Sequence, residues 1–327
     1  MTLTPEMTGL TRRALLALPC AVLPFVARAA YPERPLRLVL PFGAGSATDT
    51  LMRIVADPLG PALGQPIVID NKPGALTSLA LDQVARAAPD GYTVVAATNS
   101  IVANPAGVQR SVPYDPFRDF TTITRLASTS YVLVVAAEQP WKTARELIDY
   151  ARANPGKLNY GSGNLGGQLY GGMLSRAFGA SMTHVPYRST PPALVDLMAG
   201  QVQMMVTDLV TATGQVKAGK LRALLATAPR RTSLFPDVPT IAELGLQGVA
   251  DMPAWWGLYG PAGMPKEAVE RLNREVTAIL KRPEIRARLE SMGIEPTPST
   301  PQEQAEFTRE QWQSYVRLIK EFDIRPE

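Results

Sequence analysis

Short apolar runs alternate with segments of helical periodicity along the first third of the chain. Residues 36–40 form an apolar run of strand length that ends at Pro41, and apolar side chains then recur on one face of residues 49–63. Pro58 and Pro61 should bend or end this helix early, because proline lacks the N–H that a helix interior needs. A strand at 67–69, a helix near 76–88 and a strand at 92–96 are predicted next.

The alternation returns after a proline-rich stretch at 112–116. An apolar strand over 131–137 precedes a helix that Thr143 and Glu146 open with the spacing of a capping box. The later elements are predicted as strands at 157–161, 183–186, 202–206 and 221–227, and as helices at 168–178, 191–199, 213–219, 265–281, 283–291 and 301–322. This alternation is typical of α/β proteins with mostly parallel, doubly wound sheets. It predicts two α/β lobes joined by a hinge of two chain crossings, with the terminal helices packed back onto the first lobe.

The N-terminus indicates export. Arg12 and Arg13 precede an apolar stretch from Ala14 to Val26, and Ala27-Arg28-Ala29 has the small-x-small pattern of a signal-peptide cleavage site. The stretch is shorter than the roughly 20 residues that a membrane-spanning helix needs. Both the general secretory route and the twin-arginine route stay open. Cleavage near Ala29 would also remove Cys20, the only cysteine, so the mature chain could form no disulfide or thiolate site.

Charge and histidine content argue against nucleic-acid binding and against catalysis. The formal charge of +4 falls to about +2 once residues 1–29 are removed, and the remaining basic residues form no cluster. His184 is the only histidine, so a histidine metal site is excluded and a Ser-His-Asp triad has a single candidate base. We therefore expect no catalytic residue, no metal, no cofactor and no nucleic-acid partner.

Two glycine-rich loops, at 41–49 and 161–168, each join a predicted strand to a predicted helix. The free N–H groups and the positive end of the helix dipole make such a junction an anion site, although the first loop could also be a purely structural turn. A dinucleotide fingerprint would need glycine where Thr48 stands, and the Lys-Ser/Thr pair of a phosphate loop is missing. Ligands of open α/β sheets bind at the carboxyl ends of strands. Two such loops, one per lobe, would therefore clamp one ligand.

A series of further motifs runs in order along the whole mature chain. They are Tyr31-Pro32-Glu33-Arg34-Pro35, Gly64-Gln65-Pro66, Asn71-Lys72-Pro73-Gly74-Ala75, Pro89-Asp90-Gly91-Tyr92-Thr93, the segments 113–120, 154–160, 184–188, 196–202 and 236–243, Trp256-Gly257 and Pro261-Ala262-Gly263. Together with the first loop, these motifs resemble the Bug-type substrate-binding proteins of tripartite tricarboxylate transporters.

The resemblance implies a type II periplasmic-binding fold. Lobe 1 would comprise residues 30–128 plus 251–327, and lobe 2 residues 129–250, with residues 1–29 as the signal peptide. It also implies a periplasmic monomer that holds a small organic carboxylate through main-chain N–H groups and ordered water. The partners implied are this ligand and the membrane components of a tripartite tricarboxylate-type transporter.

The ligand contacts that the resemblance implies come mainly from the two loops. The first loop would contribute Phe42, Gly43, Ser46, Ala47 and Thr48, and the second Gly163, Leu165, Gly166, Gly167 and Gln168. Asn99 and Ser100, after the strand at 92–96, and Asp208, near the helix at 213–219, would shape selectivity.

The sequence departs from the family pattern at positions expected to determine specificity. Ser46 and Leu165 stand where glycine is usual, Leu169 replaces a common histidine, and Leu76 and Thr77 interrupt a glycine-rich run. The leucines among these replacements favour a ligand less polar than citrate or aspartate, such as an aromatic or aliphatic monocarboxylate.

Several alternatives remain at this stage. A sensor protein that presents its ligand to a receptor would need the same two lobes. An exported hydrolase would use Ser162 or Ser46 as nucleophile, but Gly161-Ser162-Gly163 lacks the full Gly-x-Ser-x-Gly elbow. Arg188 could pair with a ligand carboxylate or simply be solvated. Trp255 and Trp256 are expected to pack near the lobe crossing rather than to stack on a ligand.

Overall fold

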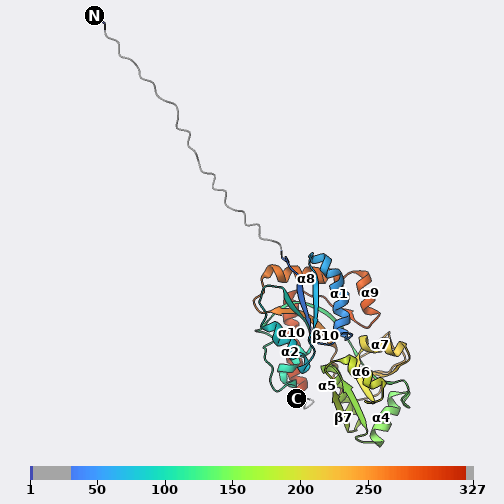
Figure 1. The fold of residues 1–327 in the computed structure, drawn as a ribbon. Coiled ribbons are helices and arrows are strands. Elements are labelled where there is room, and N and C mark those ends of the chain that lie inside the picture. Colours follow the sequence, from blue (N-terminus) through green and yellow to red (C-terminus); the bar gives the residue numbers. More distant parts are fainter. Residues whose placement is uncertain (3–30, 322–327) are drawn as a thin grey trace. The chain divides into compact units, whose positions relative to one another are not determined.

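Residues 1–2 and 31–321 are described by the computed structural model (Figure 1). The predicted cleavage site and Cys20 lie outside these residues, and the signal peptide stays a prediction. Within the described part of the chain, no helix is both long enough and apolar enough to cross a membrane.

The first sheet, called sheet A here, contains six strands in the order β11-β4-β10-β3-β1-β2. Their bounds are β1 Leu36–Leu40, β2 Ile67–Asn71, β3 Thr93–Thr98, β4 Phe120–Thr129, β10 Ala254–Pro261 and β11 Glu295–Pro296. Strand β1 pairs in parallel with β2 and β3, whereas β10 runs antiparallel between β3 and β4.

The second sheet, sheet B, contains five strands in the order β7-β6-β8-β5-β9. Their bounds are β5 Tyr131–Ala136, β6 Leu158–Ser162, β7 Met182–Pro186, β8 Met204–Asp208 and β9 Leu221–Ala226. Strand β6 is parallel to β7 and β8, and β5 runs antiparallel between β8 and β9. The antiparallel strands β5 and β10 are each the first strand that the chain enters after leaving the other sheet.

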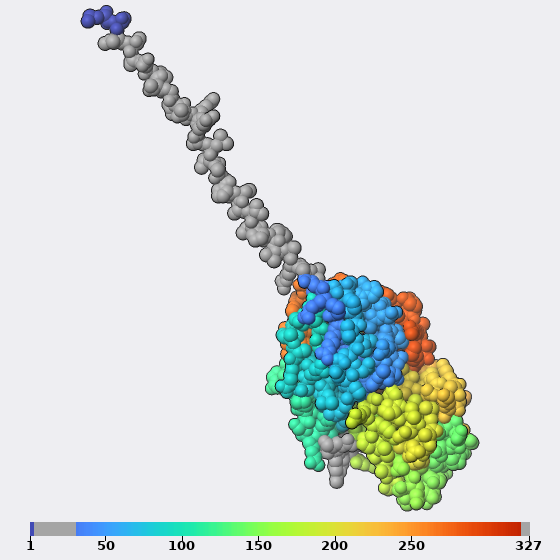
Figure 2. Space-filling model, viewed as in Figure 1, coloured from blue at the N-terminus to red at the C-terminus, as the bar shows by residue number. Residues whose placement is uncertain are grey.

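Helices cover both sheets. Their bounds are α1 Ala47–Leu63, η1 Ala75–Thr77, α2 Ser78–Ala85, α3 Ser100–Ala103, η2 Asn104–Val108, α4 Ala144–Ala153, α5 Leu165–Phe178, α6 Thr190–Met198, α7 Leu209–Lys217, α8 Lys266–Leu280, α9 Pro283–Glu290 and α10 Pro301–Glu321. Figure 1 shows α1 beside α8, and the terminal helices α8 and α10 pack against β4 of sheet A as predicted. In Figure 2 the green-to-yellow surface of sheet B and its helices adjoins the blue-to-cyan surface of the first strands and helices. The predicted α/β fold class is confirmed.

The helix predicted over 49–63 is present, but it does not end early at its prolines. Pro58 and Pro61 do not end α1, which continues to Leu63 and closes with Gly64 in the left-handed conformation. Its apolar face, from Leu51 to Leu63, packs in a buried cluster with residues of β1 and α8. This tertiary packing outweighs the local cost of two missing donors.

The sequence pattern did not reveal β4 and β10. All eight residues of β10 are buried, so the strand shows no alternation of apolar and polar positions. Strand β4 is rich in threonine and is buried irregularly along its length. Both strands therefore lack the period-two signal on which strand prediction depends. As a result, each sheet is mixed, with one long antiparallel strand where a mostly parallel sheet was expected.

Candidate functional site

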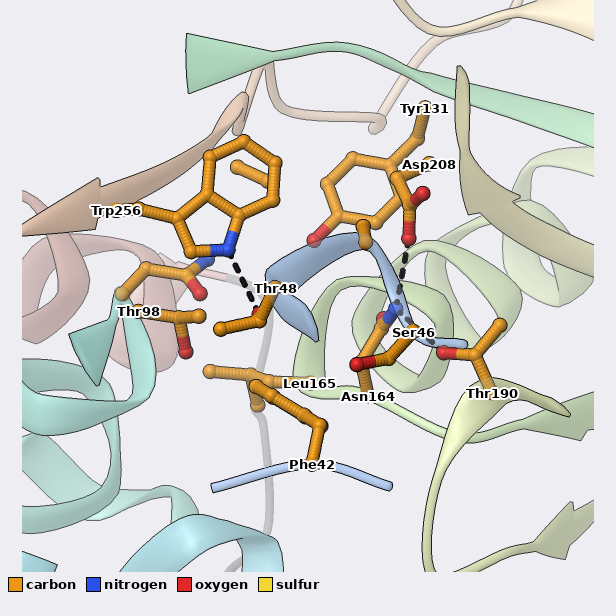
Figure 3. A pocket seen from close by; sticks show the side chains of 13 residues that line it. Phe42, Ser46, Thr48, Thr98, Tyr131, Asn164, Leu165, Thr190, Asp208 and Trp256 are labelled. Carbon is orange, nitrogen blue, oxygen red and sulfur yellow. Dashed lines mark hydrogen bonds between the residues drawn. The ribbon is translucent and has the colours of Figure 1, made fainter. Parts of the chain in front are cut away.

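Two neighbouring cavities lie at the carboxyl ends of the parallel strands of both sheets. The smaller one, called the inner chamber, has a volume of about 30 Å³ and is drawn in Figure 3. Its lining residues are Phe42, Ser46, Ala47, Thr48, Thr98, Asn99, Tyr131, Asn164, Leu165, Thr190, Asp208, Ala254 and Trp256. The larger outer chamber, of about 250 Å³, shares Phe42, Asn164 and Leu165 with it.

Asp49 and Asn71 hold the first loop in place. The Asp49 carboxylate accepts hydrogen bonds from the Gly45 N–H at 2.9 Å and from Asn71 Nδ2 at 3.1 Å. Asn71 Nδ2 also donates to the carbonyl of Phe42 at 2.8 Å. Ser46 caps α1 by accepting from the Asp49 N–H. Thus the end of β2 fixes the loop that follows β1.

The charge of Asp49 is stabilised by the donors around it. Burial alone raises the pKa of this carboxyl, but hydrogen bonds from Arg53, Gly45 and Asn71 outweigh that effect and lower its pKa below the ordinary 3.8. Asp49 is therefore ionised at neutral pH and acts as a fixed acceptor for the loop.

Asn164 connects the starts of three helices. Its side-chain oxygen caps α5 by accepting from the Gly167 N–H at 2.8 Å. Its Nδ2 donates to Thr190 Oγ1 at the start of α6, at 3.3 Å, and to Asp208 Oδ2 at the start of α7, at 3.4 Å. Figure 3 shows the bond to Asp208 as a dashed line. Asn164 was not among the predicted ligand contacts, although Asn before a predicted helix is a common N-cap signal.

Asp208 is the one carboxylate in the inner chamber. It caps α7 by accepting from the Thr211 N–H at 2.9 Å and from Thr211 Oγ1 at 2.8 Å. Only 3% of the residue is exposed. Burial raises the pKa of this carboxyl, and the two bonds from Thr211 only partly offset that rise.

Two aromatic residues of the antiparallel strands complete the inner chamber. The Trp256 indole N–H, on β10, donates to Thr48 Oγ1 at 2.8 Å and so links β10 to the start of α1 (Figure 3). Tyr131 begins β5, and its ring lies against Gly166, where any added Cβ would overlap the ring. Trp256 was expected to have only a packing role, yet it also lines the chamber. Trp255 is buried and donates to Gln311.

The structure brings most of the predicted site residues together. Phe42, Ser46, Ala47, Thr48, Asn99, Leu165 and Asp208 line the inner chamber, whereas Ser100 and Gly163 line only the outer one. Gly43, Gly166, Gly167 and Gln168 line neither chamber. The other residues that line the inner chamber were not among the predicted contacts; they are Thr98, Tyr131, Asn164, Thr190, Ala254 and Trp256.

Gly43 and Gly167 allow the backbone to pack closely. A Cβ at Gly43 would lie 2.9 Å from Ser189 Oγ, which belongs to the loop before α6. A Cβ at Gly167 would lie 2.5 Å from the carbonyl oxygen of Val206 on β8, and the N–H of Gly167 is already bonded to Asn164. Their predicted contacts with a ligand stay predictions.

The inner chamber combines several helix starts with one buried carboxylate, Asp208. Four helices, α1, α5, α6 and α7, begin at its wall, and a helix start carries a partial positive charge. At α1, α5 and α7 one N–H is bonded to the cap side chain, and the prolines of the first turn leave α6 with fewer N–H groups. No lysine or arginine is among its lining residues. A water molecule needs roughly 10–15 Å³ of such space, so about 30 Å³ accommodates a group the size of a carboxylate.

Ser162 and His184 form the hydrogen-bonded pair that a hydrolase would require. Ser162 Oγ lies 2.7 Å from His184 Nε2, on the adjacent strands β6 and β7. Neither residue lines the inner or the outer chamber. Ser46, the other candidate nucleophile, lies in the inner chamber as the cap of α1. Over residues 1–2 and 31–321, no cluster of three or more His, Cys, Asp or Glu side chains is suited to a metal ion.

The fold and the paired loops define a class of α/β binding proteins with two sheets. Within this class, the chain belongs to the family described as "Tripartite tricarboxylate transporter family receptor", whose sequence profile matches residues 51–324. The sequence resemblance to Bug-type proteins is thereby confirmed.

Individual relatives and solved structures agree with this assignment. The chain is 33% identical to a protein from the tcbD-tcbE intergenic region of Pseudomonas sp. (strain P51), over 98% of this chain and 97% of that protein. The structure "R. palustris Rpa4515 with adipate" is 33% identical, with 91% and 100% of the two chains covered and a TM-score of 0.86. MatC from Rhodopseudomonas palustris with bound malate is 32% identical, with 88% and 100% covered and a TM-score of 0.82.

Proposed function

We propose that this protein is a periplasmic solute-binding protein that captures a small carboxylate and delivers it to the membrane components of a tripartite tricarboxylate-type transporter. The observation that carries this proposal is the convergence of four helix starts on a chamber of carboxylate size. The adipate and malate bound by two structural relatives support the ligand class. The predicted signal peptide supports the compartment.

The proposed mechanism is closure of two lobes on the ligand. Lobe 1 (30–128 plus 251–327) contains sheet A, and lobe 2 (129–250) contains sheet B. The chain passes between the sheets through Ser130 and through residues 227–253. A carboxylate that contacts the starts of α1 and α5 together interacts with both lobes, so it favours the closed form over the open form.

A thermal-shift screen of the purified protein tests this function. The probes are acetate, benzoate, hexanoate, malate, adipate and citrate. We expect at least one of them to raise the melting temperature, because a ligand at 100 times its Kd stabilises the folded state by about 2.7 kcal/mol. Isothermal titration calorimetry then gives the affinity and the stoichiometry. The proposal fails if no carboxylate changes the melting temperature, or if the protein converts the bound compound to a product.

A further inference from the structure

Three consecutive residues beside the outer chamber have a backbone conformation that normally requires glycine. The φ angles of Ala75, Leu76 and Thr77 are 46°, 46° and 82°. Each such residue costs on the order of 1–3 kcal/mol and persists only where its surroundings hold it. A glycine at position 76 would adopt this conformation without strain. The leucine side chain therefore costs stability where it stands.

Hydrogen bonds from a neighbouring segment hold the strained backbone. Asn104 Nδ2 donates to the carbonyl of Leu76 at 2.7 Å, and Gln109 Nε2 donates to the carbonyl of Ala75 at 2.9 Å. Asn104 is fully buried. Leu76 is half-buried and packs against a buried apolar cluster that includes Leu81 and Ile101. The position of Leu76 is thus fixed by its surroundings.

The outer chamber is large and mainly apolar. Its apolar lining residues include Pro41, Phe42, Leu76, Leu165, Pro186 and Tyr187, and Arg188 is its one charged lining residue. A cavity of about 150 Å³ is enough to admit benzene in another protein. The volume of about 250 Å³ therefore has room for a benzene ring or a chain of several carbons.

The two chambers differ in volume, so different parts of one ligand would fit in each of them. The inner chamber has room for little more than a carboxylate, and the outer chamber is its neighbour, with Phe42, Asn164 and Leu165 lining both. We therefore expect the rest of any larger ligand to extend past these residues into the outer chamber. We propose that the outer chamber receives an apolar ligand body and that Leu76 is the residue that selects for it. The ligand class is a carboxylate that carries an aromatic ring or an aliphatic chain of about five carbons. This inference rests on the proposed function, because it concerns the same site.

Substitution of Leu76 tests the inference. Leu76→Gly removes the apolar side chain and relieves the backbone strain, so the variant should fold with an equal or higher melting temperature. Loss of about two buried methylene contacts should raise the Kd of benzoate and hexanoate roughly 15-fold. The Kd of malate, whose body is short and polar, should change less than twofold. Leu76→Ala keeps the strain but should show the same selective loss.

The matched control is Leu79→Ala, since Leu79 is 59% exposed on α2 and does not line the outer chamber. It should leave all three affinities unchanged. The inference is overturned if both Leu76 variants retain benzoate and hexanoate affinity, or if they lose malate affinity equally. It is also overturned if the unaltered protein binds malate but neither apolar probe. Binding of no carboxylate at all would instead contradict the proposed function.

Discussion

Asp208 and Trp256 show how single residues acquire their roles from the chamber that they line. Asp208 is the last residue of β8 and the N-cap of α7, and this position places its carboxylate among four helix starts and away from water. Trp256 lies on an antiparallel strand, and its indole reaches across to Thr48. The sequence predicted a role for Asp208 in ligand selectivity, but only the burial of its carboxyl in the folded protein explains why the pKa of this group is raised.

The pH dependence of stability provides a test of Asp208. Burial raises the pKa of the Asp208 carboxyl in the folded protein above 3.8, its ordinary value in the unfolded chain. At a pH between the unfolded-state pKa and the folded-state pKa, the folded state therefore holds more protons than the unfolded state. Asp208 therefore lowers stability as the pH rises through that window. Asp208→Asn keeps a cap acceptor for α7 and removes this loss, so the variant should gain stability relative to the unaltered protein as the pH rises.

Urea unfolding of both proteins between pH 4 and pH 8 measures this difference. Parallel curves across the whole range would contradict a raised pKa for Asp208. The same variant should bind malate with a different pH profile, because the neutral amide cannot change its charge.

At the scale of elements, the proposed function assigns ligand binding to the helix starts, and cap residues fix the positions of these starts. Asn164 caps α5 and also contacts the starts of α6 and α7. Asp49 and Asn71 hold the first loop in place through hydrogen bonds with the backbone of Gly45 and Phe42. A cap normally contributes only to helix stability, but these caps also set the geometry of the inner chamber.

Asn164→Ala and Thr143→Ala form a matched pair for this idea, since Thr143 caps α4 in the same way but does not line the inner chamber. Each variant should lose about 1 kcal/mol of unfolding free energy in urea. Only Asn164→Ala should weaken carboxylate binding, by about three- to tenfold, as α5 loses its fixed direction. Equal effects of both variants on binding measured by calorimetry would refute a positioning role for Asn164.

At the scale of the whole molecule, two sheets of the same plan are connected through their antiparallel strands β5 and β10. Tyr131 begins β5 and Ala254 begins β10, so the inner chamber borders the two places where the chain enters a new sheet. A ligand held there would resist separation of the sheets.

We therefore expect small-angle X-ray scattering to show a smaller radius of gyration when the protein is saturated with a carboxylate that raises its melting temperature. A carboxylate that leaves the melting temperature unchanged is the control, and it should leave the radius of gyration unchanged as well. An identical radius with and without a tightly bound ligand would contradict closure between two lobes.

The sequence by itself determined the α/β class, most of the helices and parallel strands, and the two glycine-rich loops that begin α1 and α5. These features depend on local periodicity, caps and glycine, which act over a few neighbouring residues. Tertiary structure alone decided that β4 and β10 belong to sheet A and that Tyr131, Asn164 and Thr190 share one chamber. It also decided that α1 continues through two prolines and that Leu76 adopts a left-handed backbone. Each of these outcomes depends on burial against residues distant in the chain, which local patterns do not encode.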